Sequence, residues 1–290
     1  MGATVKKQLL ASTVLTVAVT MSSASSAKTK HPSPPPPPPA PVYSWTGFYL
    51  GGNAGGAWGQ SRITSVANCN TPAGTGYICD SAGTGAANAA AFNAAGSGTI
   101  NSSAFTGGIQ AGYNYQWRAD SVVGIETDVE SFHLGGTRQG TGVYPVNGPG
   151  APAAPPAGTA FAIANSSNTN WLWTFRGRIG WLAQPNLLAY VTGGAAVTRL
   201  STSINYSDST GAVANGSATA TKTGWTVGGG VEWLLTNNWS VKGEFLYLNF
   251  GSVTANASVP SAAKATAIGT ISTKADLTAE IARLGLNYKF

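Results

Sequence analysis

The last ten residues of the chain, "IARLGLNYKF" (residues 281–290), repeat with a period of two. Apolar or aromatic side chains occupy alternate positions: Ala282, Leu284, Leu286, Tyr288 and Phe290. Polar side chains or glycine lie between them: Arg283, Gly285, Asn287 and Lys289. Because successive side chains of a strand point to opposite faces of a sheet, this pattern predicts a strand with one apolar and one polar face.

The composition of the chain favours a surface that faces lipid. Charged residues make up 9% of the 290 residues, against about 25% in a typical soluble domain. A water-exposed surface with so little charge would be prone to association, whereas a lipid-facing surface needs no charge. The net charge of +6 is spread thinly, and no Lys/Arg cluster after the first residues is of the kind that binds nucleic acid.

Three segments are predicted along the chain. Residues 1–27 combine a basic start, an apolar run and small residues up to Ala27, which predicts a cleaved secretory signal. Residues 28–44 are a proline-rich linker, which favours an extended periplasmic spacer over a docking segment for a proline-binding partner. In residues 45–290 the apolar runs are too short for a spanning helix, which needs about 20 residues. A secreted soluble protein or a β-barrel remains.

Alternation recurs in eight segments, each of which is long enough for a tilted membrane strand. They are residues 48–58, 104–117, 121–132, 170–182, 187–198, 223–234, 239–250 and 278–290. Short connections (118–120, 183–186 and 235–238) alternate with long ones (59–103, 133–169, 199–222 and 251–277). This is typical of outer-membrane barrels. We therefore predict an all-β, transmembrane, up-and-down antiparallel barrel of eight strands, with short periplasmic turns and four long extracellular loops.

Tryptophan is concentrated at the two ends of the predicted strands. The residues beside short turns or before the first strand are Trp45, Trp117, Trp181, Trp233 and Trp239. Those at the ends of long loops are Trp58, Trp171, Trp173 and Trp225. Two rings of aromatic residues at the two membrane interfaces form the girdles of a membrane barrel.

The polar faces of the predicted strands carry charge into the barrel. The acids are Glu126, Asp128, Glu130, Glu232 and Glu244, and the bases are Arg176, Arg178, Lys242, Arg283 and Lys289. Buried charges are expected to pair. An eight-stranded barrel is just wide enough for side chains to fill it, so we predict an interior closed by ion pairs. The alternative for the acidic column on residues 126–130 is a cation path or a set of catalytic carboxylates.

Other chemistry is sparse in the sequence. Cys69 and Cys79 lie close together in a predicted exported chain, which predicts a disulfide in preference to a metal site. No nucleotide-binding or nucleophile-elbow motif is present. A catalytic triad would have to combine His133 with Asp128 or Glu130, and we expect a protein that is not an enzyme and has no cofactor or metal.

Four stretches resemble a known family: "YSWTGFYLGGNAGGAWG" after the proline-rich linker, "GIETDVE", "GWTVGGGVEWLLTNNWSVKGEFLYLNFG" and the closing "ARLGLNYKF". They are similar to the small outer-membrane immunogenic (OmpA-like "porin family") barrels of alphaproteobacteria. The resemblance covers residues 45–290 without the long loops, of which the first two are unusually long and nearly uncharged. It implies an eight-stranded barrel in the outer membrane of a Gram-negative cell. Tyr288 and terminal Phe290 resemble the C-terminal signature that outer-membrane assembly machinery reads.

These features favour a non-enzymatic envelope protein that presents surface loops as an antigen. The resemblance leaves two alternatives, a small-solute porin and a protein whose loops bind haem, for which His133 is the candidate ligand. The expected partners are outer-membrane lipid and lipopolysaccharide, the barrel assembly machinery and, through the linker, peptidoglycan or other envelope proteins. We expect no peptidoglycan-binding domain of the kind that larger OmpA-type proteins carry.

Overall fold

The structure is a computed structural model that describes residues 43–150, 152–260 and 268–290. The chain divides into two units, Met1–Pro41 and Val42–Phe290. The predicted signal and all of the predicted linker before residue 43 lie outside the described residues. No helix in the described part of the chain is long and apolar enough to cross a membrane.

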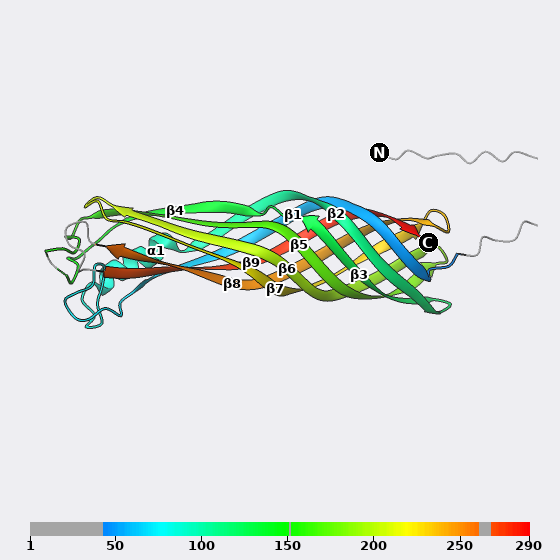
Figure 1. Cartoon of the computed structure of the whole chain (residues 1–290), viewed down its shortest axis with the longest axis horizontal. Helices are drawn as coiled ribbons and strands as arrows, with labels where there is room; N and C mark the ends of the chain where they lie inside the picture. Colours follow the sequence, from blue (N-terminus) through cyan, green and yellow to red (C-terminus); the bar gives the residue numbers. More distant parts are fainter. Residues whose placement is uncertain (1–42, 151, 261–267) are drawn as a thin grey trace, which may run out of the picture. The chain divides into compact units, whose positions relative to one another are not determined.

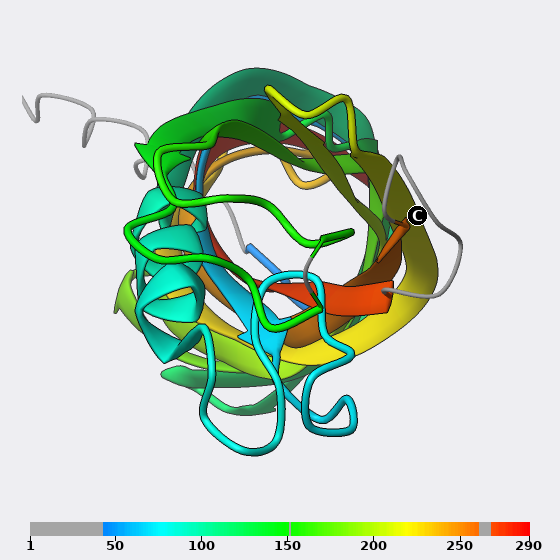
Figure 2. The ribbon, with the colours of Figure 1, turned by 90° about the vertical axis from the view of Figure 1, so that its left-hand side faces the viewer.

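The described residues form nine strands and one helix (Figure 1). In chain order they are β1 (Gly47–Asn68), α1 (Ala86–Gly96), β2 (Gly98–Arg118), β3 (Ser121–Ser131), β4 (Gly135–Val143), β5 (Ala160–Gln184), β6 (Leu187–Asp208), β7 (Val213–Leu234), β8 (Trp239–Pro260) and β9 (Ile268–Lys289). All pairs are antiparallel, and the order across the sheet is β3-β2-β1-β9-β8-β7-β6-β5-β4. Because β3 also pairs with β5, the sheet closes into a barrel, which Figure 2 shows end-on.

The strand count differs from the prediction of eight because the third predicted strand continues beyond a break. β3 pairs with residues 171–181 of β5, and β4 pairs with residues 160–168 of the same strand. Phe132 and Leu134 turn their side chains into the barrel between the two pairings and are almost fully buried. Thr169 holds the break: its hydroxyl donates to the carbonyl oxygen of Phe132 and accepts from the amide of Leu134.

The predicted long loops are too long, because the strands continue far beyond the tryptophans predicted to mark the membrane interface. The segment 199–222 is almost entirely strand, and β6 joins β7 through residues 209–212 alone. Asp208 accepts the backbone amides of Thr210 and Ala212 there, and Gly211 adopts φ 90°, which favours glycine. The segment 251–277 is likewise strand on both sides of residues 261–267.

The two halves of the barrel have opposite polarity. We call the half on the side of α1 the loop-side half; it consists of α1, β4 and residues 59–68, 98–104, 160–170, 199–208, 213–224, 251–260 and 268–279. In β9, Leu277 points inward there and Lys274 outward. In the remaining, turn-side half, Arg283 of the same strand is buried and Leu284 is 68% exposed. The turn-side exterior is apolar, as lipid requires. The loop-side interior is mainly apolar, with a few buried and mutually hydrogen-bonded polar side chains such as Asn165, as in a water-soluble protein.

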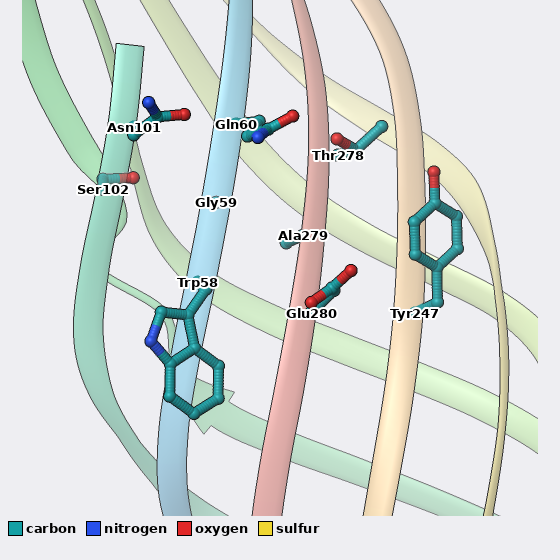
Figure 3. Close-up of a pocket in the computed structure, with 9 residues that line it drawn as sticks. All are labelled: Trp58, Gly59, Gln60, Asn101, Ser102, Tyr247, Thr278, Ala279 and Glu280. Carbon is teal, nitrogen blue, oxygen red and sulfur yellow. The ribbon is translucent and has the colours of Figure 1, made fainter.

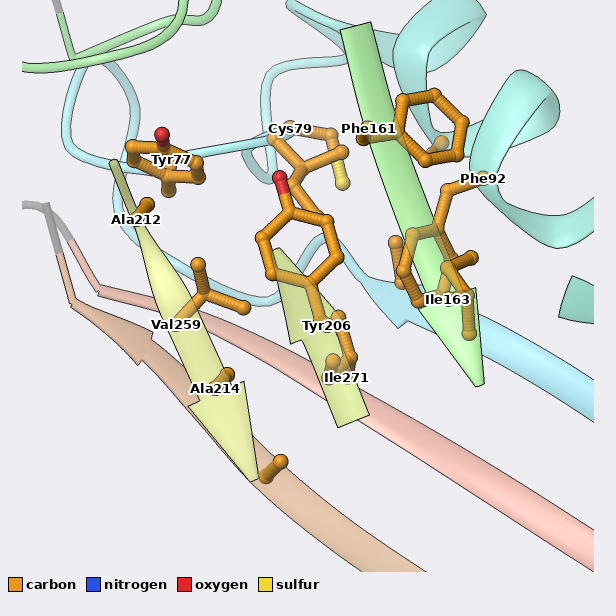
Figure 4. Packing of buried hydrophobic residues seen from close by; sticks show 14 of the residues in the cluster. Tyr77, Cys79, Phe92, Phe161, Ile163, Tyr206, Ala212, Ala214, Val259 and Ile271 are labelled. Atoms are coloured by element: carbon orange, nitrogen blue, oxygen red, sulfur yellow. The ribbon is translucent and has the colours of Figure 1, made fainter. Parts of the chain in front are cut away.

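An apolar core fills the far end of the loop-side half (Figure 4). Phe92 of α1 packs with Phe161 of β5 and Tyr206 of β6, with ring centroids 6.2 and 6.1 Å away. The helix lies against β1 and β4. In this part of the barrel β2 and β4 are not hydrogen-bonded to each other as paired strands, among the described residues. Its hydrogen bonds tie it to β1, because the amide of Ala67 donates to the side chain of Asn93 at 2.8 Å.

Asp208 joins two connections to this core. Its Oδ2 accepts the hydroxyl of Tyr77 at 2.6 Å and that of Tyr206 at 2.7 Å. Tyr77 comes from the connection before α1, and Tyr144, whose hydroxyl lies 2.9 Å from that of Tyr206, comes from the connection after β4. Burial raises the pKa of Tyr77, so its hydroxyl keeps the proton that it donates.

Candidate functional site

The charged interior of the turn-side half is the candidate functional site. Alternate residues of β3 place three acids on one inward column, and the Cα atoms of Glu126 and Arg176 face each other across β3 and β5. The buried charged residues of this half are Glu126, Asp128, Glu130, Arg176, Arg178, Glu232, Lys242, Glu244 and Arg283. We call these nine residues the interior network. Nine of the ten predicted interior charges are therefore brought together.

Arg176 is at the centre of the interior network. Its Nη2 lies 2.5 Å from Glu126 Oε1 and 2.7 Å from Asp128 Oδ2, and its Nη1 lies 2.9 Å from Glu244 Oε1. Its Nε donates to the hydroxyl of Thr174 at 3.0 Å. A fully buried guanidinium thus has three carboxylates from two strands, which compensates much of its desolvation cost.

Two further cations extend the network across the barrel. Arg283 of β9 lies 3.1 Å from Asp128, 3.0 Å from Glu130 and 2.7 Å from Glu244. Lys242 of β8 lies 2.7 Å from Glu126. Because β3, β5, β8 and β9 all contribute, the ion pairs connect opposite walls of the barrel.

Arg178 connects the network to an aromatic and amide layer. Its Nη1 lies 3.0 Å from Glu232 Oε2, and its Nε donates to Asn114 Oδ1 at 2.8 Å. The guanidinium also lies 4.9 Å from the ring of Tyr49 and 5.3 Å from that of Tyr190. Planar cations stack well on aromatic faces, so these rings hold Arg178 in place.

The sequence reasoning missed the uncharged residues of this site. Tyr49 donates its hydroxyl to Glu126 Oε2 at 2.7 Å. Gln110 donates to Asn287 Oδ1 at 2.6 Å, and Asn287 donates to Glu232 Oε1 at 2.9 Å. All three lie at inward positions of their strands, so the alternation that placed the charges could have found them.

Two predicted site residues lie elsewhere. Lys289 is half-buried near the end of β9, where its Nζ donates to the carbonyl oxygen of Ser44, and it has no ion pair among the described residues. Trp45 is 2% exposed and cannot belong to an aromatic girdle. Its indole donates to the carbonyl oxygen of Pro185 at 3.1 Å. It packs in the barrel mouth with Val122, Leu188, Tyr190 and Leu234.

The other predicted girdle residues lie on the exterior of the barrel. Trp171 is half-buried. Six residues are between 44% and 58% exposed: Trp58, Trp117, Trp181, Trp225, Trp233 and Trp239. At the end of β9, Tyr288 packs edge-on against Trp239 and Phe290, and the amide of Phe290 donates to the carbonyl oxygen of Phe48 at 3.0 Å.

The positions of the described side chains do not support the alternative of a catalytic triad, nor a metal site. The side chain of His133 is exposed, whereas Asp128 and Glu130 are buried inside the barrel, so the structure does not bring a triad together. His133 also lies between β3 and β4 and not in a surface loop as predicted. Within the described residues, no three His, Cys, Asp or Glu side chains are grouped so that they could hold a metal ion.

Glu130 is the weak point of the interior network. The nine buried residues comprise five acids and four bases, and Glu130 Oε1 has no hydrogen-bond partner in the described part of the chain. We expect Glu130→Gln to change the free energy of unfolding by less than about 1 kcal/mol, whereas Glu126→Gln should cost about 3–5 kcal/mol. Urea titration of the refolded protein in micelles measures both. Equal losses would contradict this ranking.

A disulfide closes the connection between β1 and α1. Cys69 and Cys79 are bonded, with Cα atoms 4.9 Å apart. Next to it, Asp80 accepts the backbone amides of Gly74 at 2.8 Å, Thr84 at 2.9 Å and Ala82 at 3.1 Å. These amides, and that of Gly74 first, lower the pKa of Asp80.

The lowered pKa of Asp80 predicts a pH dependence of this connection. The carboxylate contributes stability that is fully present above the ordinary Asp pKa of about 3.9 and is lost as the pH falls through the lower folded value. We expect the amide proton shifts of Gly74 and Thr84 to titrate together with a midpoint below that ordinary value. In Asp80→Asn both titrations should disappear; titration that persists in the variant would exclude Asp80 as the cause.

The exterior and interior together define a class of protein. A closed antiparallel barrel with an apolar outer band, bounded by tryptophan, and a charged interior is a membrane β-barrel. The chain belongs to the family of the outer membrane protein beta-barrel domain, which it matches over residues 14–290. The protein is therefore located in the outer membrane of a Gram-negative cell.

Two curated relatives agree with this family. The 31 kDa outer-membrane immunogenic proteins of Brucella melitensis biotype 1 and Brucella suis biovar 1 are each 29% identical over 251 residues. The match covers 86% of this chain and 85% of each relative. The family resemblance found in the sequence and the predicted outer-membrane location are both confirmed.

Solved structures with a similar arrangement include two outer-membrane proteins. The outer membrane protease OmpT from Escherichia coli has a TM-score of 0.43 and 8% identity, over 87% of this chain and 99% of that chain. OprG from Pseudomonas aeruginosa has a TM-score of 0.38 and 9% identity, over 86% and 98%. Similarities at this level say nothing of chemistry.

Proposed function

We propose that the protein is a closed, non-enzymatic barrel that stabilises the outer membrane and presents a protruding surface structure. The observation that carries this proposal is the interior network, whose ion pairs span the barrel between β3, β5, β8 and β9. An ion path through the network would have to break these pairs. A buried charge without its partner is costly, so the pairs oppose passage.

A second layer supports the same conclusion. On the loop side of the interior network, apolar side chains fill the barrel, among them Phe132, Leu172 and Phe250, each at most 1% exposed. The rings of Phe132 and Phe250 lie 6.1 Å apart across the interior. Water and small polar solutes would therefore meet an ionic layer and then an apolar one.

The surface role follows from the loop-side half. Its exterior is polar, so this half projects from the apolar band into water, and we assign it to the extracellular side. The disulfide, α1 and the Asp208 contacts make it a rigid surface antigen instead of a set of long flexible loops. We assign lipid and lipopolysaccharide to the apolar band and its tryptophans, and recognition by the barrel assembly machinery to Tyr288 and Phe290. The linker remains a candidate for contact with peptidoglycan or other envelope proteins.

Planar-bilayer recording of the refolded full chain tests the closed interior. We expect no stable conductance steps, with a general porin refolded in the same way as the positive control. Reproducible steps from the wild-type protein would refute the proposal and favour a small-solute pore. In that case neutralising Arg178 should change ion selectivity, because its guanidinium lies on the turn-side of the network.

A further inference from the structure

A groove crosses the exterior of the barrel at the boundary between its two halves (Figure 3). It has a volume of about 380 Å³ and is formed by β2, β1, β9 and β8. Trp58 and Tyr247 flank it, and Glu280 lies between them. Polar side chains line the loop-side edge, namely Gln60, Asn101 and Thr278.

The strand register fixes the position of Glu280. Its Cα atom faces that of Trp58 on β1 and that of Tyr247 on β8, so the three side chains leave the same outer face side by side. Side chains directly opposite across antiparallel strands lie about 4.5–5.5 Å apart at Cβ, which brings both rings within reach of the carboxylate. Trp58 is 50% exposed, so its ring is open to a ligand.

Glu280 differs from the other outward acid of its strand. Asp276 lies 3.3 Å from the ammonium group of Lys274, and its Cα atom faces that of Arg62. Glu280 has neither an ion pair nor a side-chain hydrogen bond within the described residues. Towards the turn side the next outward residues are Ala282 and Leu284 of the apolar band. An ionised carboxylate at the border of lipid is costly unless a cation accompanies it.

We propose that this groove binds an organic ammonium group. The carboxylate of Glu280 neutralises the positive charge, and the faces of Trp58 and Tyr247 attract it through their π electrons. The polar edge accommodates the hydroxyl, sugar or phosphate that such a group carries. A divalent metal fits less well, because Ca²⁺ takes six to eight oxygen ligands and the groove offers one carboxylate between two rings. The proposal does not depend on whether the interior is closed.

Tetramethylammonium is the simplest probe of this site. We would refold the full chain in nonionic maltoside micelles and follow binding by saturation-transfer difference NMR. Saturable binding is expected, and Glu280→Gln and Trp58→Leu should each weaken it by about tenfold or more. Asp276→Asn is the matched control, because this acid already has a cation and its loss should leave the affinity unchanged. Heat-modified gel migration verifies that each variant is folded.

Two results would overturn the proposal. One is equal affinity for tetramethylammonium in Glu280→Gln and wild type; the other is a site that depends on Glu280 but binds Ca²⁺ and not tetramethylammonium.

A second experiment, in nanodiscs, identifies the source of the ammonium group. If a lipid headgroup occupies the groove, phosphatidylcholine nanodiscs should abolish binding of the probe while phosphatidylglycerol nanodiscs retain it. Equal binding in both supports a soluble amine as the ligand.

Discussion

Replacing Arg176 with methionine is expected to lower the free energy of unfolding by about 3–5 kcal/mol. The methionine keeps much of the side-chain volume but removes the cation that Glu126, Asp128 and Glu244 share. All three carboxylates stay buried, and only Arg283 and Lys242, which already contact these same carboxylates, remain to balance three negative charges with two positive ones. Urea titration in micelles, read out by heat-modified gel migration, measures the loss.

The control is a cation on the exterior. Arg62 has no side-chain partner in the described part of the chain, so Arg62→Met should change stability by less than about 0.5 kcal/mol. A second substitution separates charge from packing: adding Asp128→Asn to Arg176→Met removes one of the excess negative charges and should recover part of the loss. An Arg176→Met protein as stable as wild type would show that the ion pairs do not hold the barrel together.

The turn-side half was predictable because one physical constraint acts on every strand. Lipid on one face and a narrow interior on the other force polar and apolar side chains to alternate along each strand. The positions of Glu126, Arg176 and Arg283 in this alternation therefore predicted that their side chains point inward. The pairing of β9 with β1 followed from the need to leave no open edge. The alternation, however, predicts which face of the sheet a side chain lies on, and not how far along the barrel axis it lies.

This limit explains the two misplaced residues. Lys289 has inward parity, but it lies at the mouth of the barrel, where backbone oxygens and not carboxylates are within reach. Trp45 precedes β1, so no alternation applies to it, and its position just before the first predicted strand suggested an interface residue. Its actual place is set by a pocket that β3, β6 and β7 form together, which no local pattern reveals.

The loop-side half was missed because its composition is that of a loop. Its strands present Ser, Thr and Asn outward, and their inward residues are mostly small or apolar but include polar ones such as Asn165, so the contrast between the two faces is weak. Irregularities in the ladder add to the difficulty: β5 shifts register between Thr169 and Leu172, and β8 between Asn249 and Gly251. Each register shift interrupts the alternation of side chains, so the sequence pattern predicts the end of a strand where the strand in fact continues.

Replacing Phe92 with alanine tests whether this half is a folded unit. α1 has 11 residues, no side-chain cap and no acidic residue in its first turn, so it depends on packing for its stability. The ring of Phe92 is fully buried against Phe161 and Tyr206, and its loss should cost about 3–5 kcal/mol through the cavity that remains. Hydrogen exchange should show faster opening of α1 while the turn-side strands stay protected.

The matched control lies two residues earlier on the same helix. Ala90 is exposed, so Ala90→Gly weakens the helix by about 1 kcal/mol without touching the core. If α1 were a loosely attached decoration, both substitutions would accelerate its exchange to a similar extent. A much larger effect at Phe92 is expected, because that ring joins the helix to β5 and β6 in the region where β2 and β4 are not paired. The apolar core would then be what keeps this half of the barrel closed beyond the membrane.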